Sequence, residues 1–337
     1  MKEEQISVFD IFKIGIGPSS SHTLGPWRAA EQFVYVLEQK GKLKDVKEIC
    51  VDLYGSLAKT GHGHGTDRAV ILGLCGYDPV TMDTSLINGI LDQVATDCRI
   101  SLKGDKKINF IPKKDVVFHM DQALPFHPNG LIFSATCDHE LVISETYYSI
   151  GGGFVIQEGE REGEDPKSSF ILPFPISYAY ELLKWHRMTG KKISEIVLEN
   201  EKMWKAESAI KADLLHIWYT MKACIYAGCH TGGVLPGGLH VQRRAFQMNL
   251  KLLGGEQFEN ETEWMANIVN SGTGFKYTLD WVSCFALAVN EQNASYCRVV
   301  TAPTNGSAGV IPAVLLYYMV FCGGTEEDVV KFLLTAG

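Results

Sequence analysis

Short alternating patterns of apolar and polar residues dominate the first half of the chain. Apolar side chains take every second position at Ile49, Val51 and Leu53, which predicts a strand with one buried face. The stretches "DVVFHM" and "GLIFSA" look similar, and "LVISETYYSIGGGFVI" reads as a strand, a glycine turn and a second strand. One strong helix is predicted from apolar residues at helical spacing, namely Trp27, Ala30, Phe33, Val34 and Leu37. Residues 1–156 are therefore expected to form an α+β domain.

Beyond residue 170 the apolar period becomes helical. Ser194 is expected to cap the helix that follows it, and a long apolar helix is predicted from about Gly309. A further helix is predicted after Thr325, which can form a capping box with Asp328. Two predicted helices have apolar faces made of Ile210, Leu214, Ile217 and Met221, and of Val329, Val330, Leu333 and Leu334.

Between the two halves, "QEGEREGEDPKSS" has charge, glycine and proline but no apolar period. Residues 157–170 are therefore expected to be a linker. Residues 171–337 are expected to form a mostly α-helical domain.

Composition sets limits on the function. The 337 residues are 46% hydrophobic and carry a formal charge of -8, as expected for a globular protein of two domains. No basic cluster follows an aromatic spacing, so nucleic acid is not an expected partner. There is no basic leader before an apolar run and no stretch of about 18 uncharged apolar residues, which predicts a cytoplasmic protein without a membrane partner.

Nine cysteines are scattered along the chain without a C-x-x-C pair, which favours free thiols over disulfides. In "CIYAGCH", Cys224, Cys229 and His230 lie close together in sequence. Zinc sites of this kind usually need a second cysteine pair, and none is present. Buried thiols near a helix end are therefore favoured over a metal site.

Two histidines among glycines, His62 and His64 in "TGHGHGTDRAV", leave three interpretations open. A metal site is disfavoured because the histidines are two residues apart and no carboxylate cluster is near. A general base fits the chemistry, since the ordinary pKa of histidine, about 6.5, lies near working pH and Asp67 could orient the ring. The third interpretation is a tight turn that contains histidine.

Three more polar stretches could serve a ligand. "GPSSSHTLGP" places Ser20, Ser21 and His22 just before a helix, whose unpaired N–H groups suit a carboxylate, although a plain serine cap explains the pattern equally well. "FHPNG" adds His127 and a turn signal at Asn129. The glycines of "YYSIGGGF" allow either close approach to an anion or a hairpin bulge.

The stretch "TAPTNGSAGV" brings hydroxyl and amide groups to the start of a helix. It lacks the lysine of a P-loop, so phosphate is not the favoured ligand. No G-x-G-x-x-G follows a strand and no G-x-S-x-G elbow occurs, which disfavours dinucleotide binding and acyl hydrolysis.

Five motifs in fixed order, running almost end to end, resemble the iron-sulfur L-serine dehydratases of bacteria in their single-chain form. They are "SVFDIFKIGIGPSSSHT", "YGSLAKTGHGHGTD", "YYSIGGGF", "GVLPGGLHVQRRA" and "NASYCRVVTAPTNGSAGVIPAV". The resemblance implies a beta-type α+β domain, similar to the allosteric substrate-binding domain of some phosphoglycerate dehydrogenases, and a helical alpha-type catalytic domain. It also implies a homodimeric lyase that converts L-serine to pyruvate and ammonia with a [4Fe-4S] cluster and no pyridoxal phosphate.

The resemblance further implies roles for individual residues. His64 occupies the family's G-H-G-T-D position and is expected to be the general base, whereas His62 is expected to be dispensable. His127 and His22 are the supporting catalytic histidines. The implied substrate-binding residues are Ser20, Ser21, Thr66, Asp67, Asn129, Ser149, Gly151, Gly152, Gly153, Thr304, Asn305 and Gly306.

In the family, three cysteines hold the cluster and leave one iron open as a Lewis acid. Those cysteines lie downstream of "TAPTNG", after the helix that starts around Glu326, and no cysteine here matches one. The cluster ligands are therefore expected beyond Gly337, in a longer protein of which this chain is a shortened form, and the chain is expected to be inactive by itself. A natural C-cap at Gly337 is the alternative.

Two rival functions remain. One is a serine-binding allosteric module without catalysis. The other is a pyridoxal phosphate dehydratase, which is disfavoured because no lysine lies in the glycine loops at 149–153 and 299–310.

Overall fold

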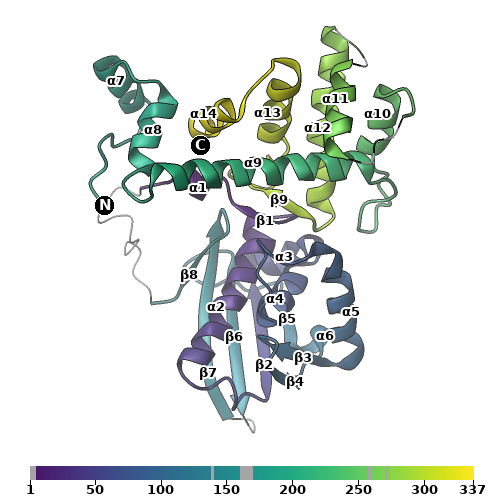
Figure 1. Cartoon of the computed structure of the whole chain (residues 1–337). Coiled ribbons are helices and arrows are strands. Elements are labelled where there is room, and N and C mark those ends of the chain that lie inside the picture. The colour runs from purple at the N-terminus through teal and green to yellow at the C-terminus, as the bar shows by residue number, and fades with distance from the viewer. Residues whose placement is uncertain are drawn as a thin grey trace. The chain divides into compact units, whose positions relative to one another are not determined.

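The protein is described by a computed structural model that covers residues 5–137, 140–159, 170–256, 258, 260–270, 272 and 274–337. The chain divides into two compact units (Figure 1). The first, called the α/β unit, comprises Gly15–Glu160 and Tyr296–Arg298. The second, called the helical unit, comprises the chain up to Ile14 together with Arg161–Ser295 and Val299–Gly337. Most of the expected linker, residues 160–169, lies outside the described residues.

The α/β unit contains a five-stranded mixed sheet (Figure 1). The middle of the sheet is antiparallel, and β2 pairs in parallel with the edge strand β5. The predicted alternation is confirmed in β2, where Ile49, Val51 and Leu53 are buried and the residues between them are not. In order across the sheet, the strands are β5 (Val116–His119), β2 (Glu48–Tyr54), β6 (Gly130–Cys137), β7 (Glu140–Gly151) and β8 (Phe154–Gln157).

Helices cover the apolar face of this sheet. The predicted helix is α2 (Gly25–Gln39), and all five of its periodic apolar residues are buried. Phe33 of α2 stacks on Phe133 of β6 with ring centroids 5.0 Å apart, so the two periodicities meet in one core. The other elements of the unit are the π-helix η1 (Ser20–Leu24), α3 (Gly55–His64), α4 (Thr66–Leu74), the 3-10 turn η2 (Thr84–Leu86), α5 (Ile87–Asp97), β3 (Arg99–Leu102), β4 (Lys106–Asn109) and α6 (Pro112–Asp115).

The helical unit is built around two long helices, α9 (Glu207–His230) and α12 (Phe275–Ala294). They cross closely because Gly228 has no side chain: a Cβ there would lie 2.5 Å from the carbonyl oxygen of Ala288. The remaining helices are α1 (Val8–Ile11), α7 (Ala179–Thr189), α8 (Ile193–Glu201), α10 (Ala245–Leu252), α11 (Glu261–Asn270), α13 (Val310–Phe321) and α14 (Glu326–Ala336). The short strands β1 (Ile14–Ile16) and β9 (Arg298–Val300) pair with each other.

Most of the helix predictions for the second half are confirmed, and one is wrong. The apolar faces predicted for α9 and α14 are buried, and Thr325 forms the expected capping box with Asp328. Ser194 does not cap a helix: α8 begins before it, at Ile193. The backbone N–H of Lys192 donates instead to the carboxylate of Glu195, at 2.7 Å, so an acidic residue inside the first turn supplies the cap.

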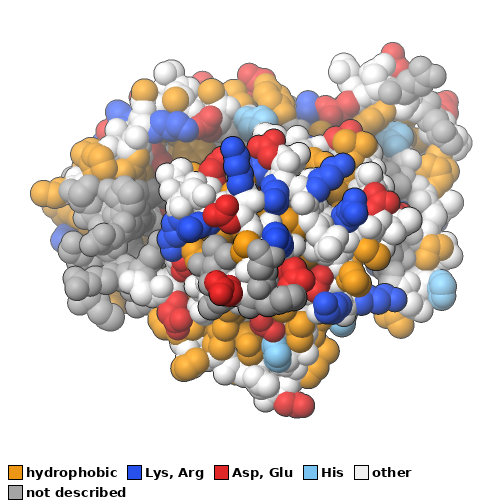
Figure 2. Space-filling view, turned by 90° about the horizontal axis from the view of Figure 1, so that it is seen from below, with side chains coloured by type: hydrophobic (Ala, Val, Ile, Leu, Met, Phe, Trp, Pro, Cys, Tyr) orange, Lys and Arg blue, Asp and Glu red, His pale blue; other side chains and the backbone are white. Residues whose placement is uncertain are grey.

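Charged side chains of both signs are mixed on the surface drawn in Figure 2, where Lys and Arg alternate with Asp and Glu. Among the helices of the described residues, none combines the length and apolar character needed to cross a bilayer.

A carboxyl on α2 makes stability depend on pH. Burial raises the pKa of Glu31 from its ordinary 4.5 to about 7, in spite of its hydrogen bond from Arg28 at 2.8 Å. Between these two values the folded protein binds a proton that the unfolded chain does not, so the free energy of unfolding falls as pH rises from about 4.5 to 7. Glu31→Gln removes this carboxyl. The free energy of unfolding of the variant is therefore expected to fall less over this pH range than that of the wild type, by at most about 3 kcal/mol.

Urea unfolding of the wild type and Glu31→Gln at several pH values measures this effect. The two proteins should differ most above pH 7, where the buried carboxylate is ionised in the fold. Parallel curves across this window would show that Glu31 titrates alike in the folded and unfolded states.

Candidate active site

The stretch that carries the two glycine-flanked histidines is helical. It forms the end of α3 and the start of α4, joined at Gly65 in the left-handed conformation with φ +61. Two residues apart on a helix, His62 and His64 point to different sides. His62 stacks on Phe118 at 3.9 Å with 67% of its side chain exposed, and no group of three metal-binding side chains occurs among the described residues. The turn interpretation therefore holds only for Gly65.

His64 has one ring nitrogen fixed and the other open. Its Nδ1 lies 3.0 Å from the carbonyl oxygen of Thr60, one helical turn earlier. Because a carbonyl only accepts, Nδ1 carries the hydrogen and the lone pair of the neutral ring is on Nε2. No hydrogen bond from a described residue occupies Nε2, so this nitrogen can accept a proton.

The carboxylate expected to orient this ring does something else. Asp67 accepts from the backbone N–H of Arg68 at 2.9 Å, and its other oxygen lies 3.9 Å from Nδ1 of His62. The expectation that Asp67 orients His64 is therefore wrong. A backbone carbonyl orients the ring because the residue four positions earlier on a helix lies directly beneath it.

His22 lies against His64, with ring centroids 4.9 Å apart. Its Nδ1 is 2.9 Å from the hydroxyl of Ser21, and its Nε2 is 2.9 Å from the hydroxyl of Ser56 at the start of α3. Burial lowers the pKa of His22, and the neighbouring charge of His64 lowers it further. Burial and His64 therefore favour the neutral form of this ring, which lies between two hydroxyl groups.

Two threonines tie the segments of these histidines together. The hydroxyl of Thr23 donates to the carbonyl oxygen of His64 at 2.8 Å, and the hydroxyl of Thr66 donates to that of His22 at 2.6 Å. Both threonines are buried. The reciprocal bonds lock η1 onto the junction of α3 and α4, where Gly65 could otherwise allow movement.

Asn129 and Ser149 link the segment of His127 to that of His22 through hydrogen bonds. The hydroxyl of Ser149 donates to the carbonyl oxygen of Ser21 at 2.7 Å, and the Asn129 amide donates to the Ser149 carbonyl at 3.0 Å. The backbone N–H of Asn129 also donates to Nδ1 of His127 at 3.1 Å. Neutral His127 therefore carries its hydrogen on Nε2 and is a donor, whereas His64 offers an acceptor.

The strand β7 approaches η1 so closely that glycine is required. A Cβ at Gly25 would lie 1.9 Å from the hydroxyl oxygen of Ser149, and one at Gly153 would lie 2.7 Å from Leu24. Gly151, Gly152 and Gly153 all have positive φ, and the pairing of β7 with β8 shifts register between Ser149 and Gly151. The glycine run therefore forms a bulged hairpin that also brings its backbone close to η1.

The serine-rich stretch serves mainly as a cap. Ser19 accepts from the backbone N–H of His22 at 3.1 Å and begins η1, so the serine-cap interpretation holds for this residue. Ser20 is buried. Ser21 alone bonds an imidazole.

Three of the predicted residues lie in the helical unit. Thr304 is exposed and its hydroxyl lies 3.0 Å from that of Ser307, and Gly306 is also exposed. Asn305 is buried, and its amide donates to the side-chain oxygen of Asn293 at 2.9 Å, while its own side-chain oxygen has no partner among the described residues. The predicted residues thus form one connected set in the α/β unit and a separate loop in the helical unit.

Buried thiols are confirmed at the end of α9. The sulfur of Cys229 lies 3.8 Å from that of Cys284, and none of the nine cysteines forms a disulfide. Burial, and the neighbouring Cys284, hold the pKa of Cys229 well above its ordinary value. Nδ1 of His230 donates to the carbonyl oxygen of Tyr226, 2.7 Å away.

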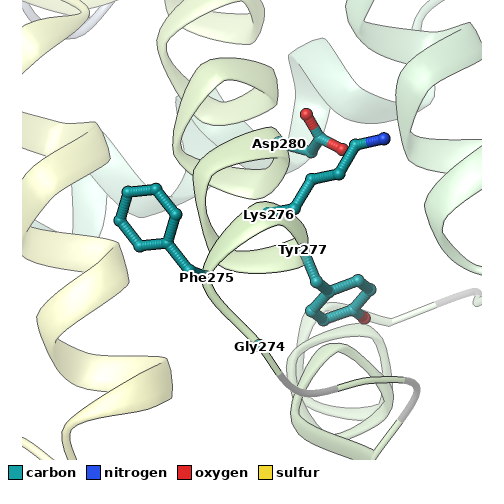
Figure 3. Close-up of a pocket in the computed structure, with 5 residues that line it drawn as sticks. All are labelled: Gly274, Phe275, Lys276, Tyr277 and Asp280. Carbon is teal, nitrogen blue, oxygen red and sulfur yellow. The ribbon is translucent and has the colours of Figure 1, made fainter.

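A separate open hollow of about 450 Å³ lies at the start of α12 (Figure 3). Phe275 points to one side of the helix, and Lys276 and Tyr277 to the other. None of the residues predicted from the sequence lines it.

Sequence reasoning missed Ser56, Thr60 and Thr23, although each contacts a predicted histidine. Thr60 can be found only once α3 is known to be helical. It precedes His64 by four residues, and on a helix this spacing brings its backbone carbonyl to the His64 ring. Ser56 and His22 are 34 positions apart, and only the fold brings them together.

Comparison with known proteins agrees with the two units. Residues 7–160 match the family described as serine dehydratase beta chain, and residues 188–337 match serine dehydratase alpha chain. The chain is 46% identical to an L-serine dehydratase of Streptomyces coelicolor and 43% identical to L-serine dehydratase 1 of Escherichia coli, in each case over 98% of this chain and 70% of the relative. An L-serine dehydratase of Helicobacter pylori is 35% identical over the same shares. The chain therefore belongs to the serine dehydratase family.

Proposed function

We propose that this protein is an L-serine ammonia-lyase that converts L-serine to pyruvate and ammonia. The names of its relatives support the substrate. The observation that carries the chemistry is the pair His22 and His64. Burial and the neighbouring His64 lower the pKa of His22, whose ring nitrogens lie beside two hydroxyl groups, and His64 presents an unoccupied Nε2.

The reaction needs a base because the α-hydrogen of serine is only weakly acidic. Nε2 of His64 takes that proton, and the carbonyl of Thr60 stabilises the imidazolium through its Nδ1 hydrogen. His22 stays neutral beside it, because a second positive charge 4.9 Å away is unfavourable. The bond between the β-carbon and the hydroxyl oxygen then breaks, and this oxygen takes up a proton and leaves as water. The resulting aminoacrylate rearranges to its imine, which a water molecule hydrolyses to pyruvate and ammonia.

The substrate carboxylate needs donors, and the α/β unit offers two. The open Nε2–H of His127 is one, and the serine hydroxyls at the start of η1 are the other. Ser20, Ser21, Thr66, Asp67, Asn129, Ser149 and Gly151–Gly153 shape this part of the site in the α/β unit. Thr304, Asn305 and Gly306 remain a separate prediction of substrate contacts within the helical unit. The partnerless oxygen of Asn305 supports a contact with an ammonium group.

The family resemblance implies a [4Fe-4S] cluster, and the described residues do not fit one. Cluster ligands are thiolates, whereas the pKa of Cys229 is raised and its sulfur is close to that of Cys284. No third metal-binding side chain joins them in the described part of the chain. We therefore assign the cluster no ligand among these residues.

Three finer features complete the proposal. The α/β unit acts as an allosteric substrate-binding type of domain, the enzyme is a homodimer, and it works in the cytoplasm. That none of the nine cysteines forms a disulfide supports a reducing compartment.

The test combines binding with turnover. We expect calorimetry to detect L-serine binding by this chain. We expect a coupled assay to detect pyruvate only in anaerobic preparations of a version of the protein that also carries the cluster ligands, called the iron-loaded enzyme. Binding without turnover in an iron-loaded sample would favour a serine-binding module. Absence of both would reject the proposed function.

A further inference from the structure

A tyrosine from a distant part of the sequence packs against the turn that follows His64. In the α/β unit the ring of Tyr296 touches Gly65, where a Cβ would lie 2.5 Å from Cε1 and 2.8 Å from the phenol oxygen. Any side chain at Gly65 would therefore collide with the ring. The left-handed φ of +61 favours glycine here as well, so two separate constraints act on this position.

The tyrosine is itself held in place from several sides. The guanidinium of Arg68 lies 4.3 Å from the centre of its ring, and Asn88 accepts a hydrogen bond from that guanidinium at 2.6 Å. The ring also packs beside a small buried cluster that includes Trp27 and Met82. Tyr296 has a φ of +58, which is uncommon for a residue other than glycine. Such a conformation persists only where the surroundings fix it.

The contact is one of packing. Among the described residues, the Tyr296 hydroxyl has no hydrogen-bond partner. Burial has the largest effect on the pKa of the Tyr296 phenol and raises it. Of the charged groups near the ring, Arg68 lowers this pKa and Asp67 raises it. The ring edge and the phenol oxygen therefore make the contact by packing, without a hydrogen bond.

We infer that Tyr296 is a positioning residue that clamps the turn at Gly65 and so keeps His64 beside His22. Within α3, the described residues give the His64 ring one hydrogen bond, to the carbonyl of Thr60. The position of the ring therefore depends on how the end of α3 is held. Thr23 and Thr66 fix that end from the side of η1, and Tyr296 fixes it through Gly65. The consequence for catalysis rests on the proposed function, whereas the consequence for the two histidine rings does not.

The experiment is a histidine titration by NMR in the full chain, together with turnover of the iron-loaded enzyme. In the wild type His22 titrates below its ordinary range, because of burial and of His64. Tyr296→Leu is expected to raise the pKa of His22, as the rings separate, and to lower kcat on the order of tenfold with little change in KM, because the base is displaced. Tyr296→Phe is expected to behave as the wild type.

Matched variants separate the clamp from a general loss of stability. Tyr35→Leu removes an exposed tyrosine of the same unit and is expected to leave the His22 titration unchanged. Arg68→Met keeps the Tyr296 ring but removes the guanidinium that lies against it. This variant is expected to shift the His22 titration in the same direction as Tyr296→Leu, by a smaller amount. This variant also provides the answer if Tyr296→Leu does not fold.

Three results would overturn the inference. One is a folded Tyr296→Leu protein with wild-type His22 titration. The second is a Tyr296→Phe protein that behaves as the leucine variant does, since the hydroxyl would then be the active part. The third, if the leucine variant cannot fold, is a wild-type titration in Arg68→Met. Turnover that survives His64→Ala would instead count against the proposed function, and the titration would still decide the clamp.

Discussion

His64→Ala is expected to lower kcat of the iron-loaded enzyme by about 10³-fold, because the substitution removes the nitrogen that takes the α-proton. The effect should fall mainly on kcat, because other residues donate the hydrogen bonds that bind the substrate carboxylate. Steady-state pyruvate formation under anaerobic conditions measures it. Exchange of the α-hydrogen of L-serine with deuterated solvent should disappear in parallel, which ties the loss to proton removal.

His62→Ala is the matched control, because it removes an imidazole two residues away on the same helix. His62 is 67% exposed and stacks on Phe118, so its loss is expected to change kcat by less than about twofold. Similar losses in both variants would refute the assignment of the base. In that case both substitutions would act by destabilising α3, and the free energy of unfolding of each variant would show this.

Local patterns predicted much of the fold. The alternation around Val51 and the helical period through Phe33 each named a buried face, and these faces meet in the core. The capping box at Thr325 marked the start of α14 correctly. These features depend on side chains close in sequence, which is why a single sequence reveals them.

The failures have a physical cause in common. "GSLAKTGHGH" is rich in glycine, so the sequence leaves a tight turn open as one of three interpretations, yet the stretch forms α3 because Leu57 and Ala58 are buried in the unit. At Ser194 the sequence offered a capping residue, and Glu195 capped the helix instead. In both cases tertiary burial or a competing partner outweighed the local preference.

The candidate site was predictable as a set of residues but not as a geometry. The motifs named His22, His64, His127 and Ser149, and the structure connects all four segments through hydrogen bonds or ring contacts. Which carbonyl orients His64, and which ring nitrogen stays open, follows only from the helix. Tyr296 could not be found at all, because its contact with Gly65 joins positions far apart in sequence.

Gly25→Ala is expected to be the most damaging change to the scaffold of the site. The new Cβ would overlap the hydroxyl of Ser149, which is fully buried and bonded to the carbonyl of Ser21. Gly25 itself has a helical φ of -61, so the cost is steric and not conformational. The free energy of unfolding is expected to fall by about 2 kcal/mol, and kcat/KM by about 10²-fold as η1 moves.

Two further variants test whether that overlap is the cause. Gly63→Ala makes the same change where no atom lies within 4 Å of the new Cβ, and is expected to raise the free energy of unfolding by about 0.5–1 kcal/mol through helix propensity. Ser149→Gly in the Gly25→Ala background removes the colliding atoms and should recover part of the lost stability, though not the bond to Ser21. Chemical unfolding of the four proteins measures both effects. If the double variant is no more stable than Gly25→Ala, the close approach of β7 to α2 does not explain why this position is glycine.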